Sequence, residues 1–238
     1  MFPLNRYRTD RQTTMTDQLL ITIDGPAGAG KTTVSRMLAD RLEYRYVDTG
    51  ALYRGVAYAA RAARVDPADE DALAALFQSM RLSFRRSAGE NRLFLDGEDI
   101  SDRIRTPAIT MMASAISAHK IVRQNLLALQ RNLGKNKAAV FEGRDMGTVV
   151  FPDADLKFYL DASLAKRARR RFCEMPAGSG QTLEMIEKDM RIRDRNDASR
   201  DIAPLRAADD AVCIDSSDLS AEAVVAVMLA KIQQRLSK

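Results

Sequence analysis

Short apolar runs alternate along this chain with segments whose apolar residues recur at helical spacing. The runs with the length of buried strands are Leu19–Asp24, Tyr46–Asp48, Ala138–Glu142, Leu156–Leu160 and Val212–Asp215. The segments with helical spacing are Lys31–Glu43, Ala51–Arg64, Leu164–Phe172 and Ala221–Leu236. Strands that alternate with helices in this way predict an α/β fold, in which a mainly parallel sheet is flanked by helices.

Two segments interrupt this alternation. Between Arg81 and Asp102, apolar residues alternate with other residues on both sides of the polar stretch Ser87–Asn91, which is typical of a β-hairpin. The helical stretch Pro107–Ser117 follows, so we expect a small β-containing insertion outside the main sheet. The second interruption is the Pro- and Gly-rich connector Met175–Gly180, which fits either a short lid or an ordinary surface loop.

The length of 238 residues and the hydrophobic content of 46% favour one domain with a sizeable core. We expect residues 1–17, which are mostly polar, to be a disordered extension, and residues 18–238 to form a single domain. We expect no signal peptide, because the N-terminal segment lacks an apolar stretch. The uncharged run Thr106–Ala118 is shorter than the roughly 18 apolar residues of a membrane span. A cytoplasmic protein that does not enter a membrane is therefore predicted.

The two cysteines, Cys173 and Cys213, are far apart and lie in no Cys-x-x-Cys or Cys/His cluster. Neither a zinc site nor a disulfide framework is supported by this spacing. We expect both cysteines to be packing residues.

The most specific motif directly follows the first expected strand. Residues 25–32 read Gly-Pro-Ala-Gly-Ala-Gly-Lys-Thr and match the pattern G-x-x-x-x-G-K-[ST] ahead of a helix. Glycines let backbone N–H groups point inward where a Cβ would clash, and the helix N-terminus adds partial positive charge. Lys31 would reach the terminal phosphates, and a hydroxyl of Thr32 or Thr33 would hold Mg²⁺. The motif predicts a nucleoside triphosphate site, and leaves open a kinase, a GTPase, a motor or an ATPase.

Polar clusters follow two further expected strands. One contains Asp48-Thr49-Gly50, with Arg54 four residues beyond it, and the other is Glu142-Gly143-Arg144-Asp145. Ligands bind at the carboxyl ends of the strands in a parallel sheet, so both clusters should converge near the phosphate-binding loop. Arginine suits phosphate dianions because it makes bidentate contacts, although each arginine taken singly could equally form a structural ion pair.

A third polar group lies on the helix expected to begin near Leu183. Arg193, Asp197 and Arg200 follow one another at spacings of four and three residues, which places all three on one helix face. A carboxylate between two guanidiniums could bind a sugar hydroxyl and a phosphate, or could form an ion-pair ladder exposed to solvent. Spacing alone does not decide between these two interpretations.

The charge balance of 37 Lys and Arg against 32 Asp and Glu gives a net charge of +5, which fits nucleic acid or small phosphorylated ligands. Tryptophan is absent and no basic block is interleaved with aromatic rings, which argues against binding of single-stranded nucleic acid. A nucleotide-gated nucleic-acid-binding module stays as an alternative function.

The blocks described above resemble the bacterial-type cytidylate kinases, which are nucleoside monophosphate kinases of the P-loop class. The resemblance runs from about Leu20 to the C-terminus and rests on Ile23–Lys31, Asp48–Arg54, Gly143–Ala154, Arg193–Arg200 and Ala203–Leu205. It implies the P-loop kinase fold and the Mg²⁺-dependent transfer of a phosphoryl group from ATP to CMP or dCMP, in pyrimidine nucleotide metabolism. An insertion of about residues 62–113 would bind the monophosphate, and the lid would span about residues 172–183. A P-loop kinase for another acceptor, such as UMP or a non-nucleotide alcohol, is the alternative within this class.

The resemblance also implies that the partners are ATP and CMP or dCMP, that the protein binds neither nucleic acid nor a membrane, and that it is a monomer. It further implies roles for individual residues. The implied ATP-binding residues are Gly25, Pro26, Ala27, Gly28, Ala29, Gly30, Lys31, Thr32, Thr33 and Arg167. The implied CMP-binding residues are Thr49, Arg54, Arg144, Arg193 and Arg200 at the phosphate, Ser114, Arg123 and Asp145 at the cytosine, and Asp197 at the ribose. The catalytic residues would be Lys31, Arg144 and Arg193. The metal site would use Thr32 and Glu142, partly through water. Further candidates for the donor side are Arg170 and Arg171.

Overall fold

The computed structural model describes residues 18–87, 90–175 and 180–237. The predicted extension, residues 1–17, lies outside the described residues. The same holds for residues 176–179 in the middle of the expected lid, and for residues 88–89 in the turn of the expected hairpin. These parts of the prediction therefore stay untested.

A five-stranded sheet forms the centre of the molecule. Its strands lie in the order β2-β6-β1-β7-β8 and every neighbouring pair is parallel. The strands are β1 (Leu20–Asp24), β2 (Arg45–Asp48), β6 (Ala139–Gly143), β7 (Leu156–Asp161) and β8 (Val212–Asp215). All residues of β1 and β6 are buried, as expected for strands that are covered on both faces. The predicted α/β fold with a mainly parallel sheet is confirmed.

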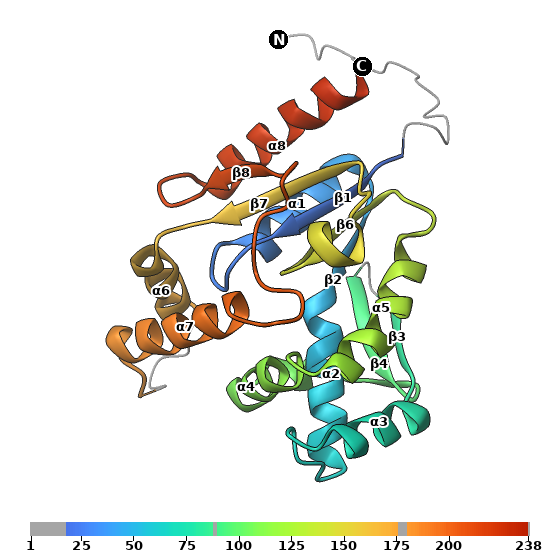
Figure 1. Cartoon of the computed structure of the whole chain (residues 1–238). Coiled ribbons are helices and arrows are strands. Elements are labelled where there is room, and N and C mark those ends of the chain that lie inside the picture. Colours follow the sequence, from blue (N-terminus) through green and yellow to red (C-terminus); the bar gives the residue numbers. More distant parts are fainter. Residues whose placement is uncertain (1–17, 88–89, 176–179, 238) are drawn as a thin grey trace, which may run out of the picture.

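Helices cover both faces of the sheet, and β1 contributes alternate residues to the two layers. Ile21 and Ile23 belong to the cluster that α1 (Lys31–Leu42) and α8 (Ala221–Leu236) form on one face. Leu20 belongs to the cluster on the other face, beside the short π-helix η3 (Met146–Val150) and α5 (Lys120–Gly134). Figure 1 shows α8 above the sheet and α2 (Thr49–Ala62) descending from it.

The insertion forms a second layer of structure below the sheet in Figure 1. Its elements are α3 (Glu70–Ser79), β3 (Leu82–Ser87), β4 (Glu90–Leu95), β5 (Glu98–Asp99), η2 (Arg103–Arg105) and α4 (Pro107–Ile116). The predicted hairpin is confirmed, since β3 and β4 pair antiparallel with Leu82 opposite Leu95. The insertion packs on α2 in an apolar cluster that includes Val56 of α2, Leu73 of α3 and Leu93 of β4.

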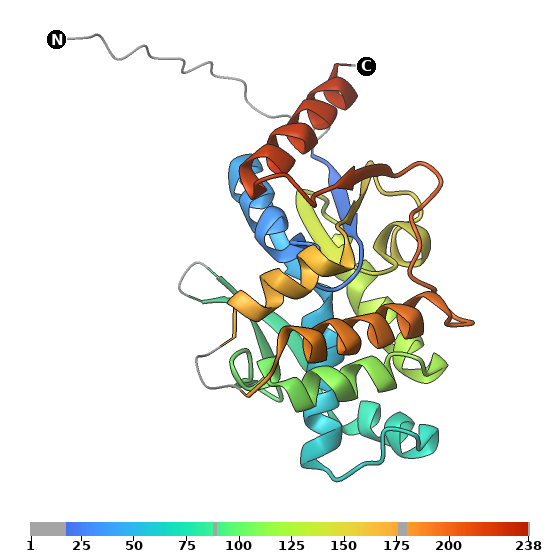
Figure 2. The same ribbon diagram turned by 90° about the vertical axis from the view of Figure 1, so that its left-hand side faces the viewer.

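Two helices lie between the sheet and this layer (Figure 2). They are α6 (Leu164–Cys173) and α7 (Leu183–Ala198), which pack on each other through Ala168, Ile186 and Met190. In Figure 2 they cross the middle of the molecule, between the sheet above and α4 below. This arrangement brings Arg170 and Arg171 of α6 and Arg193 of α7 to the carboxyl ends of the strands.

Two details differ from the sequence-based expectations. Helix α7 ends at Ala198, so Arg200 lies beyond the helix that was expected to carry it. Both cysteines are exposed rather than packed in the core. Among the described residues, no helix combines the length and apolar character needed to cross a membrane.

Candidate active site

The phosphate-binding loop connects β1 to α1, and its backbone conformation requires glycine. Gly25 has a φ of 146°, and a Cβ at this position would overlap the carbonyl oxygen of Leu160 on the neighbouring strand. Gly30, with a φ of 90°, precedes α1, and no side chain caps this helix. The first N–H groups of α1 therefore stay available for an anion, which the partial positive charge of the helix N-terminus favours.

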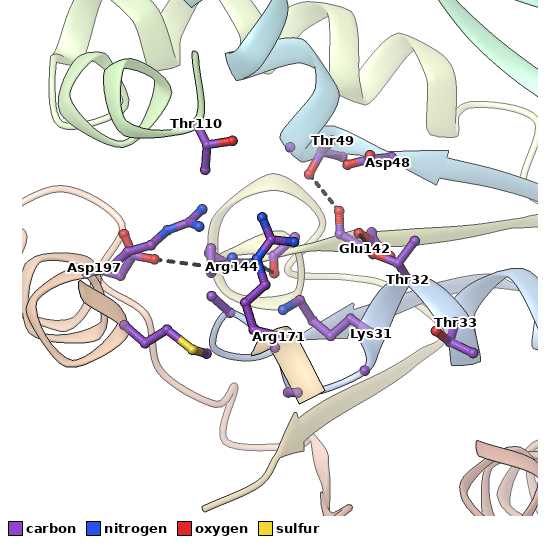
Figure 3. A pocket seen from close by; sticks show the side chains of 18 of the residues that line it. Lys31, Thr32, Thr33, Asp48, Thr49, Thr110, Glu142, Arg144, Arg171 and Asp197 are labelled. Carbon is purple, nitrogen blue, oxygen red and sulfur yellow. Dashed lines mark hydrogen bonds and ion pairs between the residues drawn. The ribbon is translucent and has the colours of Figure 1, made fainter. Parts of the chain in front are cut away.

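A cleft of about 540 Å³ opens at the carboxyl ends of the strands and runs from this loop to the insertion. Figure 3 looks into this cleft, where Lys31 and Arg171 lie on the side of the phosphate-binding loop and Thr49 and Thr110 lie on the opposite side. The cleft is lined by every residue of the predicted CMP set, namely Thr49, Arg54, Ser114, Arg123, Arg144, Asp145, Arg193, Asp197 and Arg200. Residues that lie far apart in the sequence therefore converge as the strand-end rule predicts.

Lys31 is buried at the donor end of the cleft. Its Nζ donates a hydrogen bond of 2.6 Å to the carbonyl oxygen of Pro26 within the loop. Burial, and after it the nearby Arg144 guanidinium, lowers the pKa of Lys31 well below its ordinary value. A buried cation among other cations is costly unless an anion compensates it. The position of Lys31 therefore suits a bound polyphosphate.

Arginines surround the centre of the cleft. Arg144 Nε donates to Asp197 at 3.2 Å, and Arg200 pairs with the other oxygen of the same carboxylate. Burial, followed by repulsion from Arg144, lowers the pKa of Arg193 to about 10. The Nε of Arg193 is buried and has no hydrogen-bond partner among the described residues. This cluster holds more positive charge than its own acid neutralises, so it fits a dianionic ligand.

A buried ion pair closes the end of the cleft next to the insertion. Arg123 Nη1 donates to Asp145 Oδ2 at 2.9 Å, and the two residues are only 8% and 2% exposed. The same guanidinium nitrogen donates to the hydroxyl of Tyr53 at 3.2 Å. Burial raises the pKa of Asp145, while Arg123 opposes this rise. A carboxylate and a guanidinium side by side offer an acceptor and donors to the edge of one planar ligand.

The oxygen atoms beside Lys31 fit a magnesium ion. Thr32 Oγ1 donates to Glu142 Oε1 at 2.9 Å, and the buried Oε2 of Glu142 has no partner in the described part of the chain. Burial, and then the nearby Asp48 carboxylate, raises the pKa of Glu142. The described residues contain no cluster of three or more His, Cys, Asp or Glu suited to a metal. Mg²⁺ usually keeps waters and takes one or two carboxylates plus substrate phosphates, so these residues fit such a site.

The arginines of α6 divide between two environments. Arg167 is buried behind the loop, where it donates to Ala27 O at 3.1 Å and pairs with Asp194 at 2.6 Å. It does not line the cleft, whereas Arg170 and Arg171 do. The sequence-based expectation that Arg167 contacts ATP is therefore at odds with its position, and its contacts are those of a residue that supports the loop.

Sequence reasoning missed the residues at the donor end next to β8. Ser216 lines the cleft and donates to Ala29 O at 3.0 Å, and it also accepts a hydrogen bond from Arg170 at 3.1 Å. Leu219 and Val224 form an apolar wall beyond it. The signal for Ser216 was present in the sequence, since this residue directly follows a predicted strand in the same way as the other polar clusters.

Comparisons with known proteins agree with this arrangement. A family model described as cytidylate kinase matches residues 21–234. The cytidylate kinase of Geobacter sulfurreducens is 48% identical over 91% of this chain and 94% of its own length. That of Syntrophotalea carbinolica is 45% identical over 93% of this chain and 94% of its own length. A crystal structure of an uncharacterized protein from Eubacterium ventriosum, 11% identical, shares the fold with a TM-score of 0.53 over 91% of this chain and 99% of that chain. The chain therefore belongs to the cytidylate kinase family.

Proposed function

We propose that this protein transfers the γ-phosphoryl group of ATP to CMP or dCMP, which yields ADP and CDP or dCDP. The observation that carries the proposal is a continuous cleft, which joins the phosphate-binding loop at one end to the buried Arg123–Asp145 pair at the other. The basic cluster of Arg144, Arg193 and Arg200 lies between these ends. A triphosphate donor and a monophosphate acceptor would meet there.

The donor half would hold ATP through the loop amides and Lys31. The apolar wall of Leu219 and Val224 suits a purine ring, and Arg170 and Arg171, which also line the cleft, would contact the phosphates. Thr32 and Glu142 would hold the metal, partly through water. Mg²⁺, when bound there, would supply positive charge that offsets the negative charge of the phosphates. On phosphate binding, Lys31 would exchange the Pro26 carbonyl for phosphate oxygens.

The acceptor phosphate would be held by Thr49, Arg54, Arg144, Arg193 and Arg200. No general base is required, because a phosphate monoester with a second pKa near 6 is mostly dianionic at neutral pH. The work of these residues is to bring two mutually repelling polyanions into line. Lys31, Arg144 and Arg193 would stabilise the charge of the transferring group.

Base selection would depend on Asp145, Arg123 and Ser114. Cytosine presents an amino donor at C4, where uracil presents a carbonyl acceptor. The carboxylate of Asp145 would accept from that amino group, and Arg123 and Ser114 would donate to N3 and O2. A uracil carbonyl facing a buried carboxylate leaves both acceptors unpaired, at a cost of about 1–3 kcal/mol for each. Asp197 would accept from a ribose hydroxyl.

We further propose that residues 18–238 act as one domain, in which the insertion of about residues 62–113 and the lid of about residues 172–183 close over the substrates. Closure would exclude water and so limit wasteful hydrolysis of ATP. Compact kinases with one complete cleft can act as monomers in the cytoplasm, which is what we propose here.

A coupled assay of ADP release against CMP, dCMP, UMP, AMP and GMP tests the proposed function. We expect CMP and dCMP to be the preferred acceptors, with UMP weaker by at least an order of magnitude. Equal use of CMP and UMP would refute the role of Asp145 in base selection. Preference for a purine, or salt-sensitive RNA or DNA binding without transfer to any monophosphate, would contradict the proposed reaction.

A further inference from the structure

Asp24, the last residue of β1, carries a buried carboxylate that the mechanism above does not use. Its Oδ1 accepts the N–H of Met146 at 2.9 Å, and its Oδ2 accepts the N–H of Gly147 at 2.7 Å. The residue is 4% exposed, and it is not among the residues of the described chain that line the cleft. Both of its oxygens are therefore engaged by the protein itself rather than turned toward a substrate.

The two N–H groups belong to the first turn of the π-helix η3. First-turn N–H groups have no partner within a helix and need an acceptor from elsewhere. Residue 145, which precedes η3, makes no side-chain cap. Asp24 provides this cap from a distant part of the chain, and its negative charge suits the helix N-terminus. The sheet allows this, because Asp24 faces the same side of β1 as Leu20, toward η3.

The geometry ties two residues of the proposed acceptor site to this carboxylate, one for the phosphate and one for the base. Arg144 and Asp145 form the short link between the end of β6 and η3. At one end of the link, Gly143 lies opposite Asp24 in the parallel ladder. At the other end, Asp24 holds Met146 and Gly147. The backbone of Asp24 thus lies beside one end of the link and its side chain holds the other end, and Asp24 also directly precedes the phosphate-binding loop.

We propose that Asp24 is a positioning residue for CMP recognition, which holds Arg144 and Asp145 in their binding positions relative to the phosphate-binding loop. This inference rests on the proposed function. It assigns Asp24 to the acceptor half of the site, although the residue belongs in sequence to the donor motif. Loss of its second acceptor oxygen should therefore impair the acceptor site while ATP binding is retained.

The test is the variant Asp24→Asn, which keeps the size of the side chain but replaces one acceptor oxygen by an N–H donor. We expect at least a tenfold rise in the Kd for CMP, measured by calorimetry without ATP, and a fall of at least fivefold in the kcat/KM ratio of CMP to UMP. The KM for ATP should stay within threefold of wild type. The matched control is Asp69→Asn, which alters the N-cap of α3 through Ala72 N–H at 2.9 Å, outside the residues that line the cleft.

An unchanged Kd for CMP and unchanged base selection in Asp24→Asn would overturn the proposal. So would a rise in the KM for ATP equal to that for CMP, because Asp24 would then serve the donor loop. Wild type is assayed in parallel, and its failure to phosphorylate CMP would refute the proposed function instead of this inference.

A second variant covers the case in which Asp24→Asn does not fold. Gly147→Ala displaces the start of η3 without changing Asp24, since the new Cβ would lie 3.1 Å from Thr22 Oγ1 and from Lys157 Cδ. Contacts this close require a shift of a few tenths of an ångström. We expect a rise of about threefold in the Kd for CMP with the KM for ATP unchanged, and an unchanged Kd for CMP would refute the proposal.

Discussion

Replacing Asp145 by asparagine is the sharpest perturbation of base recognition, because it changes one acceptor oxygen into a donor at nearly constant volume. In wild type this carboxylate is 2% exposed and pairs with Arg123 at 2.9 Å. A hydrogen bond to a charged group contributes about 1.5–3 kcal/mol. At 1.4 kcal/mol for each factor of ten, we expect kcat/KM for CMP to fall by roughly 10- to 150-fold.

The effect on UMP should be smaller, because the amide of asparagine can donate to the uracil carbonyl. We therefore expect the preference for CMP over UMP to fall at least tenfold. The assay is ADP release under kcat/KM conditions with both acceptors. Equal losses for CMP and UMP would refute the reasoning, since they would show that Asp145 supports the site without distinguishing the bases.

Stability must be measured alongside activity in this variant. Removing one partner of a buried ion pair costs about 3–5 kcal/mol, because the Arg123 guanidinium stays behind. Thermal unfolding with and without saturating ATP separates this loss from the loss of recognition. The control Asp102→Asn breaks a pair with Arg92 in which the carboxylate is 81% exposed, and should change neither quantity measurably.

Three further predictions concern the phosphate-binding loop and Asp24, which directly precedes it. Gly25→Ala should abolish ATP binding and lower the unfolding free energy by more than about 1 kcal/mol, whereas Gly97→Ala, also at positive φ but with an open surrounding, should retain ATP binding in calorimetry. Lys31→Met should lower kcat by roughly a hundredfold or more with an unchanged Kd for CMP; a weakened Kd for CMP would contradict this. Burial raises the pKa of Asp24 from 3.8 to about 6, so the folded protein binds this proton where the unfolded chain has lost it. As the pH rises from 4 to 6, the unfolding free energy of wild type should therefore fall relative to that of Asp24→Asn by up to about 3 kcal/mol. Lys31 and Asp145, whose charges act on the Asp24 carboxylate in wild type, are present in both proteins. The same pH dependence of the unfolding free energy in wild type and Asp24→Asn, measured by urea unfolding, would refute the assignment.

The parallel sheet was predictable because its strands are short, mainly apolar runs that alternate with helical segments. β1 and β6 are buried at every position, so their composition alone distinguishes them from half-exposed strands. Helix α3 was not recognised, although Asp69 caps it and Leu73, its buried residue, is followed by further apolar residues at helical spacing. The apolar pattern that would reveal this helix is short and weak, since only one of its residues is buried.

The π-helix η3 could not be predicted from local sequence. It spans five residues, too few for any periodicity, and its cap comes from Asp24, 122 residues earlier in the chain. Only the folded sheet brings these segments together. Tertiary contacts of this kind are the reason why a motif residue such as Asp24 has no apparent role in the sequence.

The candidate site was predictable to the extent that its residues follow strands. The clusters after β2 and β6 converge in the cleft as the sheet topology requires. The choice among the arginines of α6 was not predictable, because Ala168 is its only buried apolar residue within the described chain and does not fix how the helix is rotated. Arg167 therefore turned out to face the back of the loop, and Arg170 and Arg171 the cleft.

Competition between acceptors tests the central claim most directly. The protein is incubated with γ-labelled ATP, Mg²⁺ and an equimolar mixture of CMP, UMP, AMP and GMP, and the labelled products are separated by chromatography. Because all acceptors compete for one cleft, the product ratio equals the ratio of their kcat/KM values. We expect the label to appear mainly in CDP. Label mainly in another diphosphate, or only in inorganic phosphate, would contradict the account.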